Sequence, residues 1–328
     1  MPETPVLVVG GAGYIGSHTC LELSRRGFLP IVYDNLSNGH EEFVRWGPLE
    51  VGDIRDRARL GEVLAKYRPE TVLHFAALIE VGQSVVEPMA FYENNVIGTL
   101  TLLSALMEAG VGTFVFSSTC ATYGLPIALP MDEQHPQEPI NPYGRTKWII
   151  EQALKDLGLH AGFRSVILRY FNAAGADAEG RIGEWHKPET HAVPLAIEAA
   201  LGQRAGFKVF GSDYETRDGT CLRDYIHVED LADAHVRAVE YLLQGGCSDQ
   251  FNLGTGTGTT VKELLGAIEA VSARSFPVEY VGRRDGDSPV LVANNDKART
   301  VLGWTPSRDL GQIIQSAWHW HSRLNASG

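Results

Sequence analysis

Cysteine is scarce in this sequence: only Cys20, Cys120, Cys221 and Cys247 occur among 328 residues, and none stands at metal-ligand or redox-motif spacing to another. We therefore expect reduced thiols in a cytoplasmic protein. No apolar run approaches the ~20 residues that a membrane-spanning helix needs. Basic residues are also few, because 28 Lys and Arg stand against 40 Asp and Glu, for a net charge of -12. This balance argues against binding to nucleic acid and to anionic membranes.

The chain does have the length and apolar content of a folded enzyme. With 44% hydrophobic residues, 328 residues can bury a core without disulfides or metals. At ~150 residues per domain we expect two domains or one large α/β unit. The opening run MPETPVLVVGG has no basic region and enters a strand-like segment directly, which predicts no signal peptide.

The first half alternates short apolar runs with longer amphipathic ones. The short runs are almost continuously apolar, as in a parallel sheet covered on both faces, and predict strands at residues 6–9, 31–33, 71–75, 113–116 and 166–170. Apolar residues at spacings of three and four predict helices at residues 15–26, 57–67, 89–109 and 143–157. This alternation predicts an α/β fold with a doubly wound parallel sheet of the Rossmann type.

A glycine-rich segment, GGAGYIG at residues 10–16, joins the first predicted strand to the first predicted helix. Its glycines permit a tight turn and let backbone N–H groups approach a pyrophosphate at the helix N-terminus. Asp34 ends the next strand, 18 residues after Gly16. Its carboxylate can accept both ribose hydroxyls and would repel a 2′-phosphate, so NAD is favoured over NADP. A helix-capping aspartate beside an ordinary glycine turn is the alternative.

Tyr143 and Lys147 form a Y-x-x-x-K pattern at the start of a predicted helix, so they share one face of it. A phenol with a pKa of ~10 is a poor base at neutral pH. A lysine charge about 5 Å away contributes around 3 kcal/mol at an effective dielectric near 20, and an oxidised nicotinamide would add to this. We therefore expect Tyr143 to act as the base in an alcohol oxidation. Thr119, at the end of another strand, can hydrogen-bond the same substrate hydroxyl.

Motifs along nearly the whole chain resemble the extended short-chain dehydrogenases/reductases, and most closely the UDP-glucose 4-epimerase family. They are GGAGYIGSHT (10–19), YDNLSNG (33–39), GDIRD (52–56), HFAA (74–77), ENNVIGT (93–99), FSSTCATYG (116–124), NPYGRTK (141–147), LRYFNAAGA (168–176), RDYIHVEDLADAH (223–235), FNLGTG (251–256) and RRDGD (283–287).

This resemblance implies roles for individual residues: Tyr143 would be the base, Lys147 would bind the nicotinamide ribose, and Thr119 would be the catalytic hydroxyl. The implied cofactor-binding positions are Gly10, Gly13, Tyr14, Ile15, Gly16, Asp34, Asn35, Asp53, Ile54, Phe75, Ala76, Asn95, Lys147 and Tyr170. The implied sugar-nucleotide positions are Thr119, Asn172, His191, Phe210, Arg223, Tyr225, Arg284, Asp287 and Leu291. Two departures from some members matter: Ile79 stands where they carry a lysine near the cofactor, and His191 stands in place of an asparagine. Leu291, at the position that gates N-acetylated sugars, is intermediate in size.

The implied function is the interconversion of UDP-glucose and UDP-galactose. Tightly bound NAD would oxidise C4, the keto sugar would rotate, and the hydride would return to its other face. UDP-GlcNAc and UDP-GalNAc stay open as further substrates. Alternatives are a UDP-pentose (xylose/arabinose) 4-epimerase, an ordinary NAD dehydrogenase, a nucleotide-sugar 4,6-dehydratase and a non-catalytic NAD or sugar-nucleotide sensor. A dehydratase needs carboxylates after the catalytic hydroxyl, where this chain has Cys120 and Ala121.

Two further expectations concern organisation. We expect residues 1–175 to form an NAD-binding Rossmann domain and residues 176–328 to form a smaller α/β domain that binds the sugar nucleotide. The segment 226–256 could return to the first sheet. The helices 89–109 and 143–157 resemble those of a dimeric four-helix bundle, so we expect a homodimer. We expect no metal site, because His186 and His191 are better explained as structural or base-proximal residues.

Overall fold

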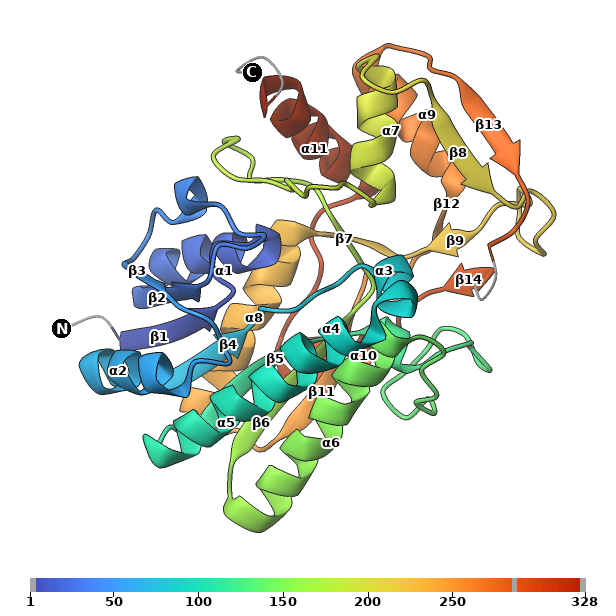
Figure 1. Cartoon of the computed structure of the whole chain (residues 1–328). Helices are drawn as coiled ribbons and strands as arrows, with labels where there is room; N and C mark the ends of the chain where they lie inside the picture. The colour runs from blue at the N-terminus through green and yellow to red at the C-terminus, as the bar shows by residue number, and fades with distance from the viewer. Residues whose placement is uncertain (1–3, 285–287, 325–328) are drawn as a thin grey trace.

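The computed structural model describes residues 4–284 and 288–324, and its main body is a seven-stranded parallel sheet (Figure 1). The strand order is β11-β6-β5-β4-β1-β2-β3. Successive strands are added on one side of β1 up to β3 and then, from β4 on, on its other side, as in doubly wound folds. The strands are β1 (Thr4–Val9), β2 (Phe28–Asp34), β3 (Leu49–Val51), β4 (Thr71–His74), β5 (Thr113–Thr119), β6 (Arg164–Tyr170) and β11 (Asp249–Leu253). The predicted fold class is confirmed.

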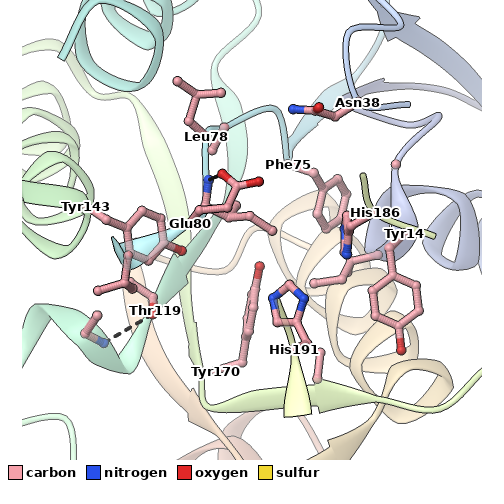
Figure 2. A pocket seen from close by; sticks show the side chains of 18 of the residues that line it. Tyr14, Asn38, Phe75, Leu78, Glu80, Thr119, Tyr143, Tyr170, His186 and His191 are labelled. Carbon is pink, nitrogen blue, oxygen red and sulfur yellow. Dashed lines mark hydrogen bonds between the residues drawn. The ribbon is translucent and has the colours of Figure 1, made fainter. Parts of the chain in front are cut away.

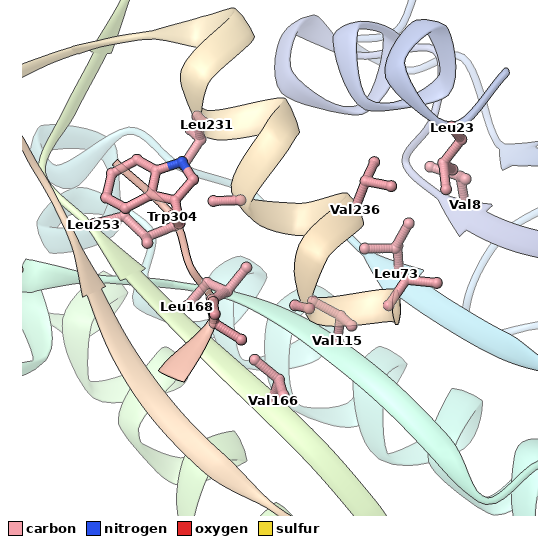
Figure 3. Close-up of a cluster of buried hydrophobic side chains, with 14 of the residues drawn as sticks. Val8, Leu23, Leu73, Val115, Val166, Leu168, Leu231, Val236, Leu253 and Trp304 are labelled. Carbon is pink, nitrogen blue, oxygen red and sulfur yellow. The ribbon is translucent and has the colours of Figure 1, made fainter. Parts of the chain in front are cut away.

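Helices cover both faces of this sheet. One core contains Val6 and Val8 of β1 with side chains of α1 (Tyr14–Arg25) and α8 (Val228–Leu243) (Figure 3). The opposite core contains Leu7 and Val9 with side chains of α2 (Arg57–Tyr67), α5 (Thr99–Glu108) and α6 (Pro142–Ala161). Successive side chains of a strand point to opposite faces, so a sheet buried on both sides needs apolar residues at every position. This explains the continuous apolar runs of the sequence.

The predicted helix 89–109 is divided in three. A short α4 (Pro88–Phe91) leads into a π-helical segment, η2 (Tyr92–Gly98), before α5 begins. A Cβ at Gly98 would lie 2.5 Å from Cδ1 of Ile54, so glycine allows this segment to approach the sheet. π-Helical turns often occur at functional sites, and this one carries Asn95 inward. A preceding helix, α3 (Val81–Val86), was not predicted.

The smaller part of the molecule has its own core, formed by α7 (Ala192–Ala200), α9 (Val261–Ser272) and α11 (Leu310–Leu324). Beside these helices lie short strands of two to four residues, too short for a periodic signal in the sequence, whereas α10 (Asp296–Val301) packs on the large sheet, where Ala298 joins the core of Val6 and Val8. The strand pairs are β7 (Asn172–Ala174) with β10 (Tyr225–His227), β8 (Phe207–Phe210) with β13 (Val278–Val281), and β9 (Leu222–Arg223) with both β12 (Thr259–Thr260) and β14 (Val290–Leu291).

The chain crosses between the two parts more than once. After β10 it enters α8, which packs against α1, and then β11, which pairs with β6 at the edge of the large sheet. The division of the chain at residue 175 stays a prediction. Within the part of the chain that the structure describes, no helix combines the length and the apolar character that a membrane span requires.

Candidate active site

A cavity of about 500 Å³ opens at the carboxyl ends of the parallel strands. Its sheet wall, as we call it, is formed by residues that end or follow β1, β2, β4, β5 and β6 and by the start of α6. Its opposite wall, the loop wall, comes from residues 184–194 and from β9, β10 and β14. Doubly wound sheets bind ligands at this edge, where the strand order reverses.

The glycine turn lies against the loop that follows β4. Gly10 has a positive φ of 81°, and a Cβ there would lie only 2.5 Å from the backbone nitrogen of Ala76. A Cβ at Gly16 would lie 2.2 Å from the carbonyl oxygen of Gly10. The start of α1 faces the cavity, because Gly13, Tyr14, Ile15 and Gly16 all line it. A helix N-terminus in this position favours a phosphate group.

Asp34 lies at the end of β2 on the cavity wall, where it is nearly buried. Its two carboxylate oxygens accept hydrogen bonds from the backbone N–H groups of Ala12 (3.0 Å) and Leu36 (2.9 Å). Burial raises the pKa of this carboxyl above its usual value, and these hydrogen bonds oppose the shift. Each oxygen keeps a further lone pair with which it can accept a ribose hydroxyl.

Two of the expected cofactor-binding residues act from behind the wall. Asp53 accepts a hydrogen bond from Asn35 (3.0 Å), which lines the cavity, and its ion pair with Arg55 holds its pKa below the usual range. Asn95 donates to the carbonyl oxygen of Leu78 (2.9 Å) and accepts from its N–H (2.8 Å). Both therefore fix segments that line the cavity. Ile54, Phe75, Ala76 and Tyr170 lie on the wall itself.

Tyr143 and Thr119 meet at one end of the cavity (Figure 2). Thr119 is the last residue of β5, and Tyr143 lies in the first turn of α6. Asn141 caps this helix, because its side-chain oxygen accepts a hydrogen bond from the Gly144 N–H (2.8 Å). A Cβ at Gly144 would lie 2.5 Å from the carbonyl oxygen of Ala121, so glycine lets the helix approach the segment after β5. A hydrogen bond with Thr119 favours the phenolate of Tyr143.

The expectation that Lys147 makes Tyr143 acidic is not met by the protein groups alone. Burial, and then the neighbouring Tyr170, raise the pKa of Tyr143 above its usual value, and they outweigh the hydrogen bond with Thr119. Lys147 is buried and donates to the carbonyl oxygen of Ser117 (2.9 Å), behind the cavity wall. Burial lowers its pKa to about 7, against the opposing charge of Glu151. The charges of Lys147 and of bound NAD, on which the expectation rests, must therefore also overcome the desolvation of both side chains.

Residues expected to bind the sugar nucleotide divide into two groups. Those that line the same cavity are Asn172, His191, Arg223, Tyr225 and Leu291. Phe210 and Arg284 lie off it and stack on each other, with the guanidinium carbon 3.7 Å from the ring centroid. Asp287 lies outside the residues that the structure describes.

Sequence reasoning did not assign Glu80 or Glu184 to this cavity, and it gave His186 only a structural or base-proximal role. Glu80 follows β4 and lies near Tyr143, whose pKa its charge raises further (Figure 2). Glu184 and His186 lie on the loop wall, near Glu189 and His191. Burial opposes the charged form of the two imidazoles, but the carboxylates outweigh it and raise the pKa of His186 to about 9 and that of His191 to about 10. Isolated charged residues in loops have no periodicity that would have identified them.

Comparison with known proteins gives a consistent result over the whole chain. The model of the NAD dependent epimerase/dehydratase family matches residues 6–254. A UDP-glucose 4-epimerase of Rhizobium leguminosarum bv. trifolii is 76% identical over 325 residues, which make up 99% of each chain. Another, of Rhizobium meliloti (strain 1021), is 74% identical over 328 residues and 100% of each chain.

A solved structure agrees in fold. The crystal structure of UDP-glucose 4-epimerase from Brucella ovis in complex with NAD superposes with a TM-score of 0.95, at 52% identity, and the alignment covers 97% of this chain and 98% of that one.

Proposed function

The chain belongs to the NAD dependent epimerase/dehydratase family, and we propose that it interconverts UDP-glucose and UDP-galactose with NAD as its cofactor. The observation that carries this proposal is the arrangement of one cavity: the glycine turn, Asp34, and the Thr119–Tyr143 pair all face it. A non-catalytic sensor would need the first two features but not the Thr119–Tyr143 pair.

The described residues of the sheet wall fit NAD. Glycine is required at Gly10 and Gly16, where a side chain would meet backbone atoms, and the helix N-terminus behind them suits a pyrophosphate. The carboxylate of Asp34 suits the unphosphorylated ribose of NAD and disfavours a 2′-phosphate. When bound, oxidised NAD supplies an acceptor for the hydride that leaves C4 of the hexose. It also supplies a positive ring charge, which adds to the charge of the Lys147 ammonium.

The chain's own residues handle the proton and the sugar nucleotide. Tyr143 takes the proton from the 4-hydroxyl and returns it, and Thr119 orients that hydroxyl by a hydrogen bond. Asn172 and Arg223 face the cavity from the other side and hold the diphosphate, for which a guanidinium is well suited. Inversion at C4 requires the hexose to present both faces, so firm binding of UDP must be combined with loose binding of the hexose.

The direct test incubates purified protein with UDP-glucose, without added NAD, and follows UDP-galactose by chromatography. Tyr143→Phe removes the proton acceptor and should lower kcat by about 10²–10⁴-fold. Its affinity for UDP, measured by calorimetry, should stay close to that of the wild type. Full activity in Tyr143→Phe would reject the role of the phenol, and absence of UDP-galactose with the wild type would reject the proposed function.

Substrate breadth is tested at Leu291, which lies on the cavity wall in β14. Parallel reactions with UDP-GlcNAc and with UDP-xylose compare an N-acetylated hexose and a pentose with UDP-glucose. Leu291→Ala enlarges the space at this position. It should raise kcat/KM for UDP-GlcNAc relative to UDP-glucose by about 10-fold, which corresponds to ~1.4 kcal/mol of relieved steric contact. An unchanged preference would show that Leu291 does not contact the acetamido group.

A homodimer is supported by an exposed apolar face on one side of the molecule. Ile97, Leu100 and Met107 follow one another at helical spacing along η2 and α5, and they are 55%, 41% and 44% exposed. Met89 of α4 and Val86 of α3 are also exposed. Such a face suits a second copy of the chain. Ile97→Lys should shift the mass measured by light scattering from dimer to monomer, whereas a wild-type monomer would contradict the proposal.

A cytoplasmic location is supported by the cysteines. Within residues 4–284 and 288–324 none of them forms a disulfide, and Cys20, Cys120 and Cys221 are buried. Free thiols are typical of a reducing compartment. Fractionation of cells that express the chain, followed by immunodetection, tests this location directly.

A further inference from the structure

The loop that precedes α7 brings four metal-ligating side chains together. Glu184, His186, Glu189 and His191 follow one another in the pattern E-x-H-x-x-E-x-H, and one ligand atom from each lies within 4.8 Å of all the others. The side chains of Glu184 and Glu189 are only 4% and 8% exposed. These four side chains are called the His/Glu cluster below.

The ligand atoms are unevenly spaced, from 2.9 Å up to at most 4.8 Å, around the separation of a tetrahedral site. Nδ1 of His191 lies 3.0 Å from Glu184 Oε1 and 2.9 Å from Glu189 Oε1. Nδ1 of His186 lies 3.4 Å from Glu184 Oε1 and 3.7 Å from Glu189 Oε2. Zn²⁺ binds imidazole nitrogen and carboxylate oxygen at about 2.0–2.2 Å, so a tetrahedral shell separates its ligand atoms by roughly 3.3–3.6 Å.

Glu189 Oε1 already accepts hydrogen bonds from the backbone N–H groups of Thr190 (2.7 Å) and His191 (2.8 Å), but one imidazole nitrogen of the cluster has no such partner. Nδ1 of His186 is buried without a hydrogen-bond partner, although it faces two carboxylates at 3.4 and 3.7 Å. As metal ligands both imidazoles would be neutral, and the cluster would then carry two negative charges, of which that of Glu184 is almost fully buried. A divalent cation placed among the four atoms would neutralise both charges and give His186 Nδ1 a partner.

Contacts with other elements hold the loop in this shape. Trp320 of α11 donates its indole N–H to the carbonyl oxygen of Glu184 (2.9 Å). His40 hydrogen-bonds the carbonyl oxygen of Trp185 (2.7 Å) and stacks on its ring at 4.1 Å. The ligand side chains are thus supported from outside the loop, as metal ligands generally are.

We propose that Glu184, His186, Glu189 and His191 form a binding site for a divalent cation, with Zn²⁺ as the ion that fits best. Two imidazoles and two carboxylates in a tetrahedral arrangement favour Zn²⁺ over Mg²⁺ or Ca²⁺, which take six or more oxygen ligands. Glu184, His186 and His191 also line the cavity, so the bound cation stiffens the loop wall. His186 and His191 stand apart from Tyr143 and Thr119, toward Tyr14 (Figure 2).

The competing arrangement is a cluster of ion pairs in which both imidazoles are protonated. The experiment that separates the two uses the full chain, stripped with a chelator, reloaded with Zn²⁺ and freed of excess metal by gel filtration. We expect about one zinc per chain by elemental analysis. His186→Asn and Glu189→Gln should each weaken zinc binding at least ~10-fold in competition with a chromophoric chelator.

Matched controls are His160→Asn, at the exposed end of α6, and Glu179→Gln, an exposed carboxylate earlier in the same loop. Both should bind zinc as the wild type does. Circular dichroism confirms that each variant is folded. X-ray absorption of the wild-type zinc complex requires no variant and should show imidazole ligands in a four-coordinate shell. A wild type without bound zinc, equal binding by His186→Asn and Glu189→Gln, or a shell of oxygen alone would each overturn the proposal.

Discussion

The two walls of the cavity are built in different ways. On the sheet wall, regular elements place the functional groups: Asp34 and Thr119 end β2 and β5, and Tyr143 lies in the first turn of α6. On the loop wall, side chains hold one another, as Glu184 and Glu189 do with two imidazoles. The sheet wall therefore depends on backbone geometry, and the loop wall depends on charge. Substitutions that change only one of these properties should distinguish the two walls.

The largest effect is expected at the glycine turn of the sheet wall. Gly10→Ala places a Cβ 2.5 Å from the Ala76 nitrogen at a positive φ, so it should abolish retention of NAD and lower the free energy of unfolding by at least about 3 kcal/mol. Gly27 is the matched control, with a φ of 79° and no atom within 4 Å of an added Cβ. Gly27→Ala should cost only ~1–2 kcal/mol. Equal losses in urea denaturation would show that steric fit is not decisive.

The corresponding change on the loop wall removes charge without changing shape. Glu184→Gln leaves two imidazoles beside a single carboxylate in a buried site, and should cost about 3 kcal/mol in urea unfolding. It should raise KM for the sugar nucleotide but leave NAD retained. Glu179→Gln, whose side chain is 66% exposed, should change stability by less than ~0.5 kcal/mol. Loss of NAD from Glu184→Gln would contradict the independence of the two walls.

Lys147 introduces one pH-dependent term behind the sheet wall. Burial lowers its pKa to about 7, with Glu151 opposing, whereas an unfolded lysine titrates near ~10.4. Between these values the unfolded chain binds a proton that the folded chain does not, so this group adds stability as pH rises from about 7 to ~10. Its slope is at most ~1.4 kcal/mol per pH unit. In nucleotide-free protein, Lys147→Met should lack this increase in the free energy of unfolding with pH. If the variant and the wild type had the same pH dependence of unfolding, Lys147 would not be the group responsible.

The smallest effect is expected at Glu80, whose charge raises the pKa of Tyr143 less than burial and Tyr170 do. Glu80→Gln removes that charge, so the acid limb of the kcat/KM profile should move slightly to lower pH. Glu80→Asp keeps the charge and should restore the wild-type profile. A shift of the same size in both variants would show that packing, not charge, is responsible.

The same difference between the walls explains what could be predicted from the sequence. The sheet wall follows from local patterns: apolar runs mark the strands, and residues directly after them reach the cavity. Desolvation is not visible in a sequence, so the expectation that Lys147 and bound NAD together lower the pKa of Tyr143 did not include the burial that raises it. Helix boundaries across η2 were missed because the π-helical segment depends on Gly98 meeting Ile54.

The loop wall could not be predicted because its shape depends on distant contacts. The His/Glu cluster forms only where Trp320, 136 residues from Glu184, holds the loop by its carbonyl oxygen. Phe210 and Arg284, which the family resemblance places at the sugar nucleotide, stack on each other and are not among the residues that line the cavity, so their role stays a prediction.

The return of the chain to the large sheet sets an order of assembly during synthesis. β11 covers the edge of β6, and α8 covers Val8 and Leu23, yet both elements follow most of the loop wall in the chain. A nascent chain that has emerged only to residue 175 would therefore expose an unpaired strand edge and half of its apolar core, which favours aggregation. The Rossmann unit can close only after residue 253 has left the ribosome, by which time residues of both walls are available to fold together.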